Sequence, residues 1–209
     1  RRAAQSGMSV QLDTGMASIE EVKKNVKIIE QEGNNKIIIH QCPSGYPAYL
    51  ESINLNIIPI LKNEFDYPIA FSDHSPGFDM NIAAVALGAN LIEKTITEDR
   101  TTPSVEHMMS IEPDQLKNFI QSIRDMEIAL GNGVRKISKD ELYKRDSIRR
   151  SVFLNEDVKS GTKLNKVQVE FRRPGFNISP DKYEELIKKN ATIKSNLKKG
   201  QPLKISDIL

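Results

Sequence analysis

Hydrophobic and polar positions in the first two thirds of the chain alternate between short apolar runs and stretches with helical spacing. The short runs predict strands at residues 9–12, 36–40, 69–71 and 90–96. The helical stretches predict helices from about 18, around 54–64, over about 79–87 and over about 112–130. Ser18 and Glu21 form a capping-box pattern at the first helix. Pro59 is expected to kink or split the second helix.

Four strand–helix units in series predict an α/β fold with a parallel sheet. Polar residues end every predicted strand, and a (β/α)8 barrel builds its active site at the carboxyl ends of its strands. An open doubly wound sheet would carry a glycine-rich phosphate turn, and the sequence has no GxGxxG or GxxxxGK[ST] motif. A complete barrel needs about 250 residues. Residues 1–131 therefore predict about half a barrel.

The character of the chain changes after Gly131. Residues 132–146 predict a charged linker, and residues 147–209 predict a separate, small, mostly β domain. Short strands are expected there at 151–154 and 167–171, with a helix near 180–188. A domain of about 60 residues is only marginally stable alone.

Composition narrows the function classes. The 209 residues include 30 Lys and Arg against 28 Asp and Glu, and a net charge of +2 argues against a nucleic-acid partner. One Cys excludes an intramolecular disulfide and fits a reducing compartment. No apolar run approaches the ~18 residues of a membrane helix, so we expect no membrane partner. Because the chain opens with Arg1, we expect its start to lie inside a longer protein.

Six sets of motifs, in order, carry a family resemblance. They are Thr14–Ala17, Cys42–Pro47, Phe71–Ser75, Ala83–Ala89 with Ile92–Lys94, Glu106-His107 with Ser110–Pro113, and Arg150-Ser151 with Arg172–Gly175 and Ile178–Pro180. In these motifs the chain resembles the C-terminal part of the N-acetylneuraminate (sialic acid) synthases, including legionaminate and pseudaminate synthases. The resemblance implies strands five to eight of a TIM barrel, with the first four strands upstream. It also implies a C-terminal SAF domain, a fold related to type III antifreeze proteins.

The resemblance further implies a transferase of surface-glycan biosynthesis that acts in the cytoplasm. Such enzymes condense phosphoenolpyruvate with an N-acetylated amino sugar, such as N-acetylmannosamine, and release phosphate by C–O cleavage. A divalent metal, Mn²⁺ or Mg²⁺, polarises the sugar aldehyde. The SAF domain of one subunit caps the site of the other in a domain-swapped homodimer. We expect this chain alone to be inactive.

A non-catalytic sugar-binding or regulatory relative is the alternative function. Ice binding through the SAF fold is disfavoured by the charged surface expected there, since a shared fold does not imply a shared function.

His74 is the leading site residue, because imidazole is a good Mn²⁺ ligand and the end of a barrel strand is the right place for it. We expect it to be a metal ligand and a catalytic residue. The resemblance assigns Glu106 to the sugar hydroxyls, as a second catalytic residue, and offers His107 as a further metal ligand. The expected substrate-binding residues are Thr14, Ser44, Tyr46, Ser72, Lys94 and Arg173.

These substrate-binding residues have different expected partners. Ser72 would hold an anionic group of phosphoenolpyruvate, and Ser44 and Tyr46 would contact the anion and the sugar. Arg173 would reach the N-acetyl carbonyl in the partner subunit, which suits its planar donor fork. Lys94 either faces the phosphate or bridges to Glu93.

Other residues of these motifs leave alternatives open. Asp73 either orients His74 or caps the next helix. Cys42 is expected to be packed rather than nucleophilic, because no paired His activates it.

Two positions depart from the family pattern. Thr95 stands where the family usually has a second metal-binding His. Either the metal has fewer protein ligands here, or His107 takes part. Asp13 stands where the family usually has a Ser that contacts phosphoenolpyruvate. A carboxylate beside an anion is unfavourable unless it is protonated or faces a metal.

Overall fold

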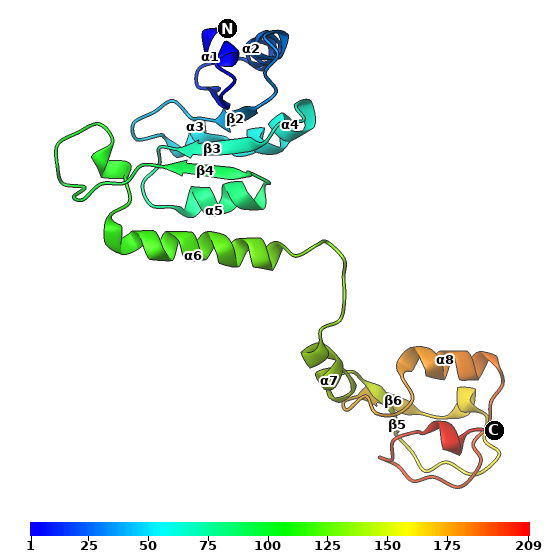
Figure 1. Ribbon diagram of the computed structural model, residues 1–209. Coiled ribbons are helices and arrows are strands. Elements are labelled where there is room, and N and C mark those ends of the chain that lie inside the picture. Colours follow the sequence, from blue (N-terminus) through cyan, green and yellow to red (C-terminus); the bar gives the residue numbers. More distant parts are fainter. The chain divides into compact units, whose positions relative to one another are not determined.

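The structure, a computed structural model, describes residues 1–209 except for the side chain of residue 146. The chain forms two compact units, Arg1–Gly133 and Val134–Leu209 (Figure 1). The first unit is built on a four-stranded parallel sheet with the order β1-β2-β3-β4. Its strands are β1 (Val10–Asp13), β2 (Ile37–Gln41), β3 (Ile69–Asp73) and β4 (Leu91–Lys94). The predicted parallel α/β arrangement is confirmed.

Helices precede, connect and follow the strands of this sheet, and those between the strands pack on one of its faces. They are α1 (Arg2–Gln5), α2 (Ile19–Gln31), α3 (Leu50–Ile53), α4 (Ile57–Glu64), α5 (Asp79–Ala86) and α6 (Pro113–Leu130), with a 3₁₀ turn at His107–Met109. Alternate strand residues such as Ile39 and Phe71 are fully buried and pack in one core with Val26 of α2 and Leu61 of α4. Because side chains alternate along a strand, the polar residues between them point to the opposite face. We call that opposite face the polar face.

The helix boundaries follow local sequence signals. Ser18 caps α2 and forms the predicted capping box with Glu21. Helix α6 begins at Pro113, whose missing N–H costs nothing in the first turn. It runs beside α5, and the rings of Phe78 and Phe119 pack 5.5 Å apart between their centroids (Figure 1).

The second predicted helix, around 54–64, is the single helix α4, and Pro59 does not split it. A separate short helix, α3, lies before it and ends at Asn54, which takes the left-handed conformation at φ 43°. Pro59 is the third residue of α4. The first N–H groups of a helix have no partner inside the helix, so a proline there breaks no hydrogen bond.

The segment expected to be a linker is partly helical. Helix α7 (Lys139–Ile148) begins at Ser138, which forms a capping box with Glu141. The helix has acidic residues in its first turn and Arg145 in its last turn, which suits the helix dipole. Residues 132–146 therefore contain most of a helix rather than only an extended connection.

The remainder of the second unit is a small β-rich fold. Antiparallel strands β5 (Ser151–Leu154) and β6 (Val169–Arg172) are followed by helix α8 (Pro180–Lys188), with 3₁₀ turns at Leu164–Lys166 and Ile205–Asp207. Further single bridges pair distant segments, including Lys163 with Thr192 and Ile193 with Ile208. The core is apolar, and the buried Tyr183 hydroxyl donates to the Leu164 carbonyl at 2.9 Å. In the part of the chain described here, no helix has the length and apolarity needed to cross a membrane.

Candidate functional site

Four polar residues gather on the polar face near the carboxyl ends of the strands. Asp13 of β1 stands in register with His40 of β2, and Ser72 of β3 stands in register with Glu93 of β4. The Ser72 hydroxyl donates to Glu93 Oε1 at 2.6 Å. Since parallel strands all end at the same edge, the residues that follow them meet there as well.

His74 lies just after β3 and is buried. Its Nδ1 is 2.9 Å from the Pro43 carbonyl oxygen, which can only accept, so Nδ1 carries the proton. The Tyr46 ring packs 4.4 Å from the imidazole, and the His74 backbone oxygen accepts from the Ala48 N–H at 2.9 Å. His74 Nε2 makes no hydrogen bond with any residue that the structure describes. This is the usual arrangement of a metal-binding His, with the second nitrogen left for a ligand.

The loops after β1 and β2 pack closely together. The N–H and hydroxyl of Thr14 both donate to the His40 carbonyl, at 3.2 Å and 2.7 Å. A Cβ on Gly15 would lie 2.7 Å from Ser44 Oγ, so only glycine fits without a shift. A cavity of about 490 Å³ adjoins Thr14, Cys42 and Ser44. Ser44 is exposed at this edge and can contact a ligand. The Thr14 hydroxyl donates its proton to the His40 carbonyl and has none left to donate to a ligand.

Lys94 is not on the polar face, which corrects both predictions made for it. Its ammonium is 2.8 Å from Asp73 Oδ2 and also contacts the Ser75 carbonyl, on the side of the sheet that α5 covers. Asn81 of α5 donates to the same carboxylate at 2.6 Å. Lys94 follows Glu93 directly, and neighbouring strand residues point to opposite faces. It can therefore neither face the site with Glu93 nor bridge to it.

Asp73 makes no hydrogen bond with the His74 ring and is not the N-cap residue of α5. Its Oδ1 accepts from the backbone N–H and the hydroxyl of Ser75, at 2.8 Å and 2.6 Å, and not from His74. The residue before α5 is Phe78, so Asp73 does not cap that helix either. Asp73 instead fixes the turn that carries His74 by binding the residue after it.

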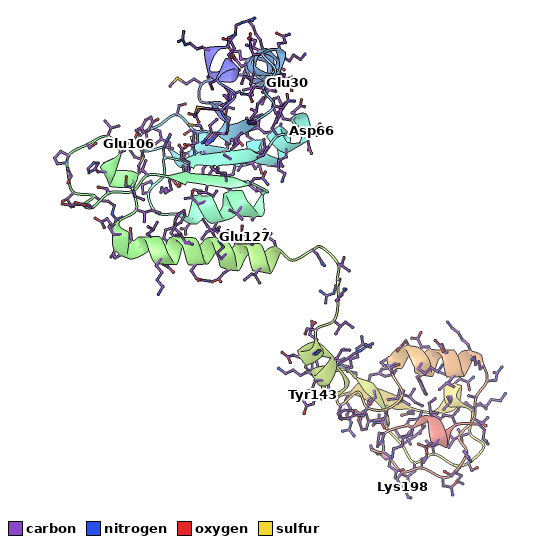
Figure 2. The ribbon with its side chains drawn as sticks, in the orientation of Figure 1. Glu30, Asp66, Glu106, Glu127, Tyr143 and Lys198 are labelled. Atoms are coloured by element: carbon purple, nitrogen blue, oxygen red, sulfur yellow. The ribbon has the colours of Figure 1, made fainter. Side chains whose placement is uncertain are left out.

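The electrostatic character of this edge is acidic. Burial raises the pKa of the Cys42 thiol most, and the negative charge of Asp13 raises it further. A hydrogen bond from Ser72 lowers this pKa, and the charge of Glu93 has a smaller raising effect. The pKa of Tyr46 is also raised, first by desolvation and then by Cys42, Glu106 and the other two carboxylates. Figure 2 places Glu106 on the long loop after β4. These shifts keep Cys42 a neutral thiol, as expected for a packed residue.

The other metal-ligand candidates have separate partners. His107 Nδ1 lies 3.2 Å from Thr97 Oγ1 and 3.3 Å from the Asp99 carbonyl oxygen. The Thr95 hydroxyl accepts from Ser110 at 2.9 Å. Among the residues that the structure describes, no group of three or more His, Cys, Asp or Glu is arranged to hold a metal ion.

Arg173 belongs to the second unit, in the loop after β6. Its side chain is exposed and has no hydrogen bond or ion pair with any described residue. The loop itself is held in place, because the Ser151 hydroxyl donates to the Pro174 carbonyl at 2.6 Å. A Cβ on Gly175 would lie 2.8 Å from Arg149 Cβ and 2.9 Å from its backbone carbonyl.

His40 is a site residue that the sequence-based assignment missed. Its Nδ1 lies 3.8 Å from Asp13 Oδ1 and 3.8 Å from Glu93 Oε2, and neither ring nitrogen has a hydrogen-bond partner. The spacing in the sequence could have indicated this role, because His40 lies two residues before Cys42 and therefore shares the polar face with it.

Comparisons with known proteins place this geometry in a family. The model of the NeuB family matches residues 1–135, and the model of the SAF domain matches residues 149–209. The N,N'-diacetyllegionaminic acid synthase of Legionella pneumophila is 34% identical over 92% of this chain and 54% of its own length. The pseudaminic acid synthase of Campylobacter jejuni is 36% identical over 94% of this chain and 56% of its own length.

A solved structure gives the same picture. The crystal structure of N-acetylneuraminic acid (sialic acid) synthetase from Leptospira borgpetersenii matches with a TM-score of 0.62 and 34% identity, over 68% of this chain and 50% of that one. The chain thus spans about half the length of the relatives that it matches. By its sequence and by the fold around His74, the chain belongs to the NeuB family and carries a SAF domain after its NeuB part.

Proposed function

We propose that this chain is the C-terminal part of an enzyme that condenses phosphoenolpyruvate with an N-acetylated amino sugar and releases phosphate. Its parallel strands would be strands five to eight of a (β/α)8 barrel, followed by the SAF domain. The family match and the synthases among the relatives support this function. The observation that carries it is His74, held at a strand end with Nδ1 bonded to Pro43.

A divalent metal, Mn²⁺ or Mg²⁺, is the expected cofactor, and when bound it would polarise the aldehyde of the acceptor sugar. His74 fits this role because its Nε2 is left for a ligand. Thr95 offers no second imidazole, so His107 is the other candidate. The chain would then supply one or two ligands, and water or substrate oxygens would complete the set.

The remaining residues would bind substrate through the groups they leave available. Ser44 and Tyr46 are exposed at the strand ends, and a neutral Tyr46 hydroxyl can donate to an anion or a carbonyl. Glu106 would accept from sugar hydroxyls. Ser72 already donates to Glu93, so its oxygen is left to accept rather than to bind an anion. In a domain-swapped homodimer, Arg173 would reach the N-acetyl carbonyl in the partner's site.

Metal binding by the chain tests this function. Mn²⁺ is titrated calorimetrically into the wild type, His74→Ala, His107→Ala and the control Asp66→Asn. Asp66 is exposed and precedes β3, and Figure 2 shows it at the opposite end of the sheet from Glu106. We expect His74→Ala to abolish binding and Asp66→Asn to leave it unchanged. Mn²⁺ binding that survives His74→Ala contradicts the proposed metal role.

A second candidate is a non-catalytic sugar-binding relative. It is favoured by Thr95 in place of a His and by the lack of a three-residue metal group among the described residues. N-acetylmannosamine binding that does not depend on Mn²⁺ would support it. Phosphate release from phosphoenolpyruvate is measured in parallel, and we expect none from this chain alone. Turnover by the chain alone would contradict the half-barrel part of the proposal.

A further inference from the structure

Two carboxylates from two other strands approach one imidazole nitrogen of β2. His40 Nδ1 is 3.8 Å from an oxygen of Asp13 and 3.8 Å from an oxygen of Glu93. The His40 side chain is only 1% exposed, whereas those of Asp13 and Glu93 are 66% and 54% exposed. A buried ring thus faces two carboxylates that are largely exposed to solvent, one of which, Glu93, also accepts from Ser72.

The hydrogen-bonding of this ring is incomplete as it stands. Both His40 nitrogens are buried without a partner, although even a neutral imidazole carries one N–H. A buried donor that is left without an acceptor destabilises the fold. A separation of 3.8 Å is too long for a hydrogen bond, but a side-chain movement of about 1 Å by either carboxylate would close it. The stable arrangement is therefore one in which His40 donates to one of these two carboxylates.

The surroundings favour ligands that donate hydrogen bonds. The pKa values of Cys42 and Tyr46 are raised first by burial and then, to a smaller extent, by the negative charges of Asp13, Glu93 and, for Tyr46, Glu106. The nearest strand lysine, Lys94, lies on the other face with Asp73. An anion placed beside Asp13 would meet repulsion, whereas hydroxyl groups would meet acceptors.

We propose that His40 is a positioning residue that holds the carboxylates of Asp13 and Glu93 on the polar face, which makes this edge a subsite for the hydroxyl groups of the acceptor sugar rather than for phosphoenolpyruvate. The inference rests on the proposed function for the identity of the two substrates. It concerns this chain in particular, because Asp13 departs from the family pattern described above.

The positioning role is tested first by NMR of the imidazole N–H protons, without any ligand. We expect His40 to give a downfield N–H signal that exchanges slowly with water. The signal should be retained in Asp66→Asn and in each single variant, Asp13→Ala and Glu93→Ala, and lost in the double variant, because alanine removes the acceptor oxygens that Asn or Gln would keep. A wild-type chain without a protected His40 signal overturns the positioning role.

The subsite is tested by titrating N-acetylmannosamine and phosphoenolpyruvate separately into the chain. We expect His40→Leu to weaken binding of the sugar about tenfold, and His40→Gln to regain part of it because the amide can donate. Asp13→Ser should weaken binding of the sugar and strengthen binding of phosphoenolpyruvate. The subsite is overturned if wild type binds no sugar, or if Asp13→Ser and His40→Leu both leave sugar binding unchanged. Sugar binding that follows these variants in a chain with no Mn²⁺ site would sustain the inference while the proposed enzymatic function fails.

Discussion

The ammonium group of Lys94 lies 2.8 Å from Asp73 Oδ2, and the two side chains are only 2% and 0% exposed. The carboxylate also accepts from Ser75 and Asn81, so its oxygens are well satisfied. This buried pair joins β4 to the turn that carries His74. The position of His74 therefore depends on a charge pair that lies outside the substrate site.

Removal of one partner should destabilise the first unit strongly. Lys94→Met leaves the Asp73 carboxylate buried and unpaired, and we expect the free energy of unfolding to fall by about 3–5 kcal/mol. Denaturant unfolding followed by circular dichroism measures the change. The matched control is Lys23→Met, which removes the exposed pair with Glu64 and should lower the free energy of unfolding far less. Equal losses in the two variants would show that Lys94 is not held as described.

Gly15→Ala tests the close packing of the loops after β1 and β2. The new methyl group would lie 2.7 Å from Ser44 Oγ and 3.4 Å from the Cys42 carbonyl oxygen. We expect a loss of about 1 kcal/mol in the free energy of unfolding. The double variant Gly15→Ala/Ser44→Ala removes the closest contact and should regain most of it. If the double variant is as unstable as the single one, Ser44 is not the atom that limits the space.

The reactivity of Cys42 reports the acidity of the strand-end site. Burial raises the pKa of this thiol and Asp13 raises it further, so less thiolate is present at any given pH than for an ordinary cysteine. Alkylation by iodoacetamide at pH 8 should be slow, and raising the pH should accelerate it. Asp13→Asn removes one negative charge and should speed alkylation roughly two- to fivefold.

Cys42 is the only cysteine in the chain, so the modified fraction can be read directly by mass spectrometry. Asp66→Asn serves as the control and should leave the rate unchanged. If Asp13→Asn leaves the alkylation rate unchanged, Asp13 does not lie close enough to the thiol to affect its pKa.

Gly175→Ala probes the loop that carries Arg173. The added Cβ would meet Arg149 Cβ at 2.8 Å and the Arg149 backbone at 2.9 Å, and a backbone cannot rotate away as a side chain can. We expect a loss of about 1–3 kcal/mol from the second unit. Hydrogen exchange of the β5 amides in the whole chain isolates this effect from the first unit. Unchanged protection of Val152 and Leu154 would contradict the close approach.

Local signals account for what the sequence predicted well. The capping box of α2 and the bounds of β5 and α8 depend on residues close together in the chain, and all three are confirmed. The same kind of signal at Ser138 was masked by the surrounding charges, so α7 was missed. Pro59 was expected to kink or split the helix around 54–64, but it lies in the first turn of α4 and does not split it.

The sequence predicted which edge of the sheet carries the site, but not which face of the sheet each side chain points to. Polar residues after each strand correctly indicated one shared edge of a parallel sheet. The side that Lys94 faces depends on the exact strand bounds and on a partner 21 positions away, which periodicity cannot supply. His40 was overlooked because its importance comes from its distances to Asp13 and Glu93 on other strands.

The alternation of Ser72 and Asp73 also limits how this chain can change over evolutionary time. Ser72 contacts Glu93 on one face of β3, and Asp73 contacts Lys94 on the other. Insertion or deletion of one residue within β3 would exchange these environments, with a hydroxyl sent into the helix layer and a third acid sent into an already acidic site. Length variation among descendants of this sequence should therefore be confined to the connecting loops, where new substrate preferences can arise without disturbing the strands.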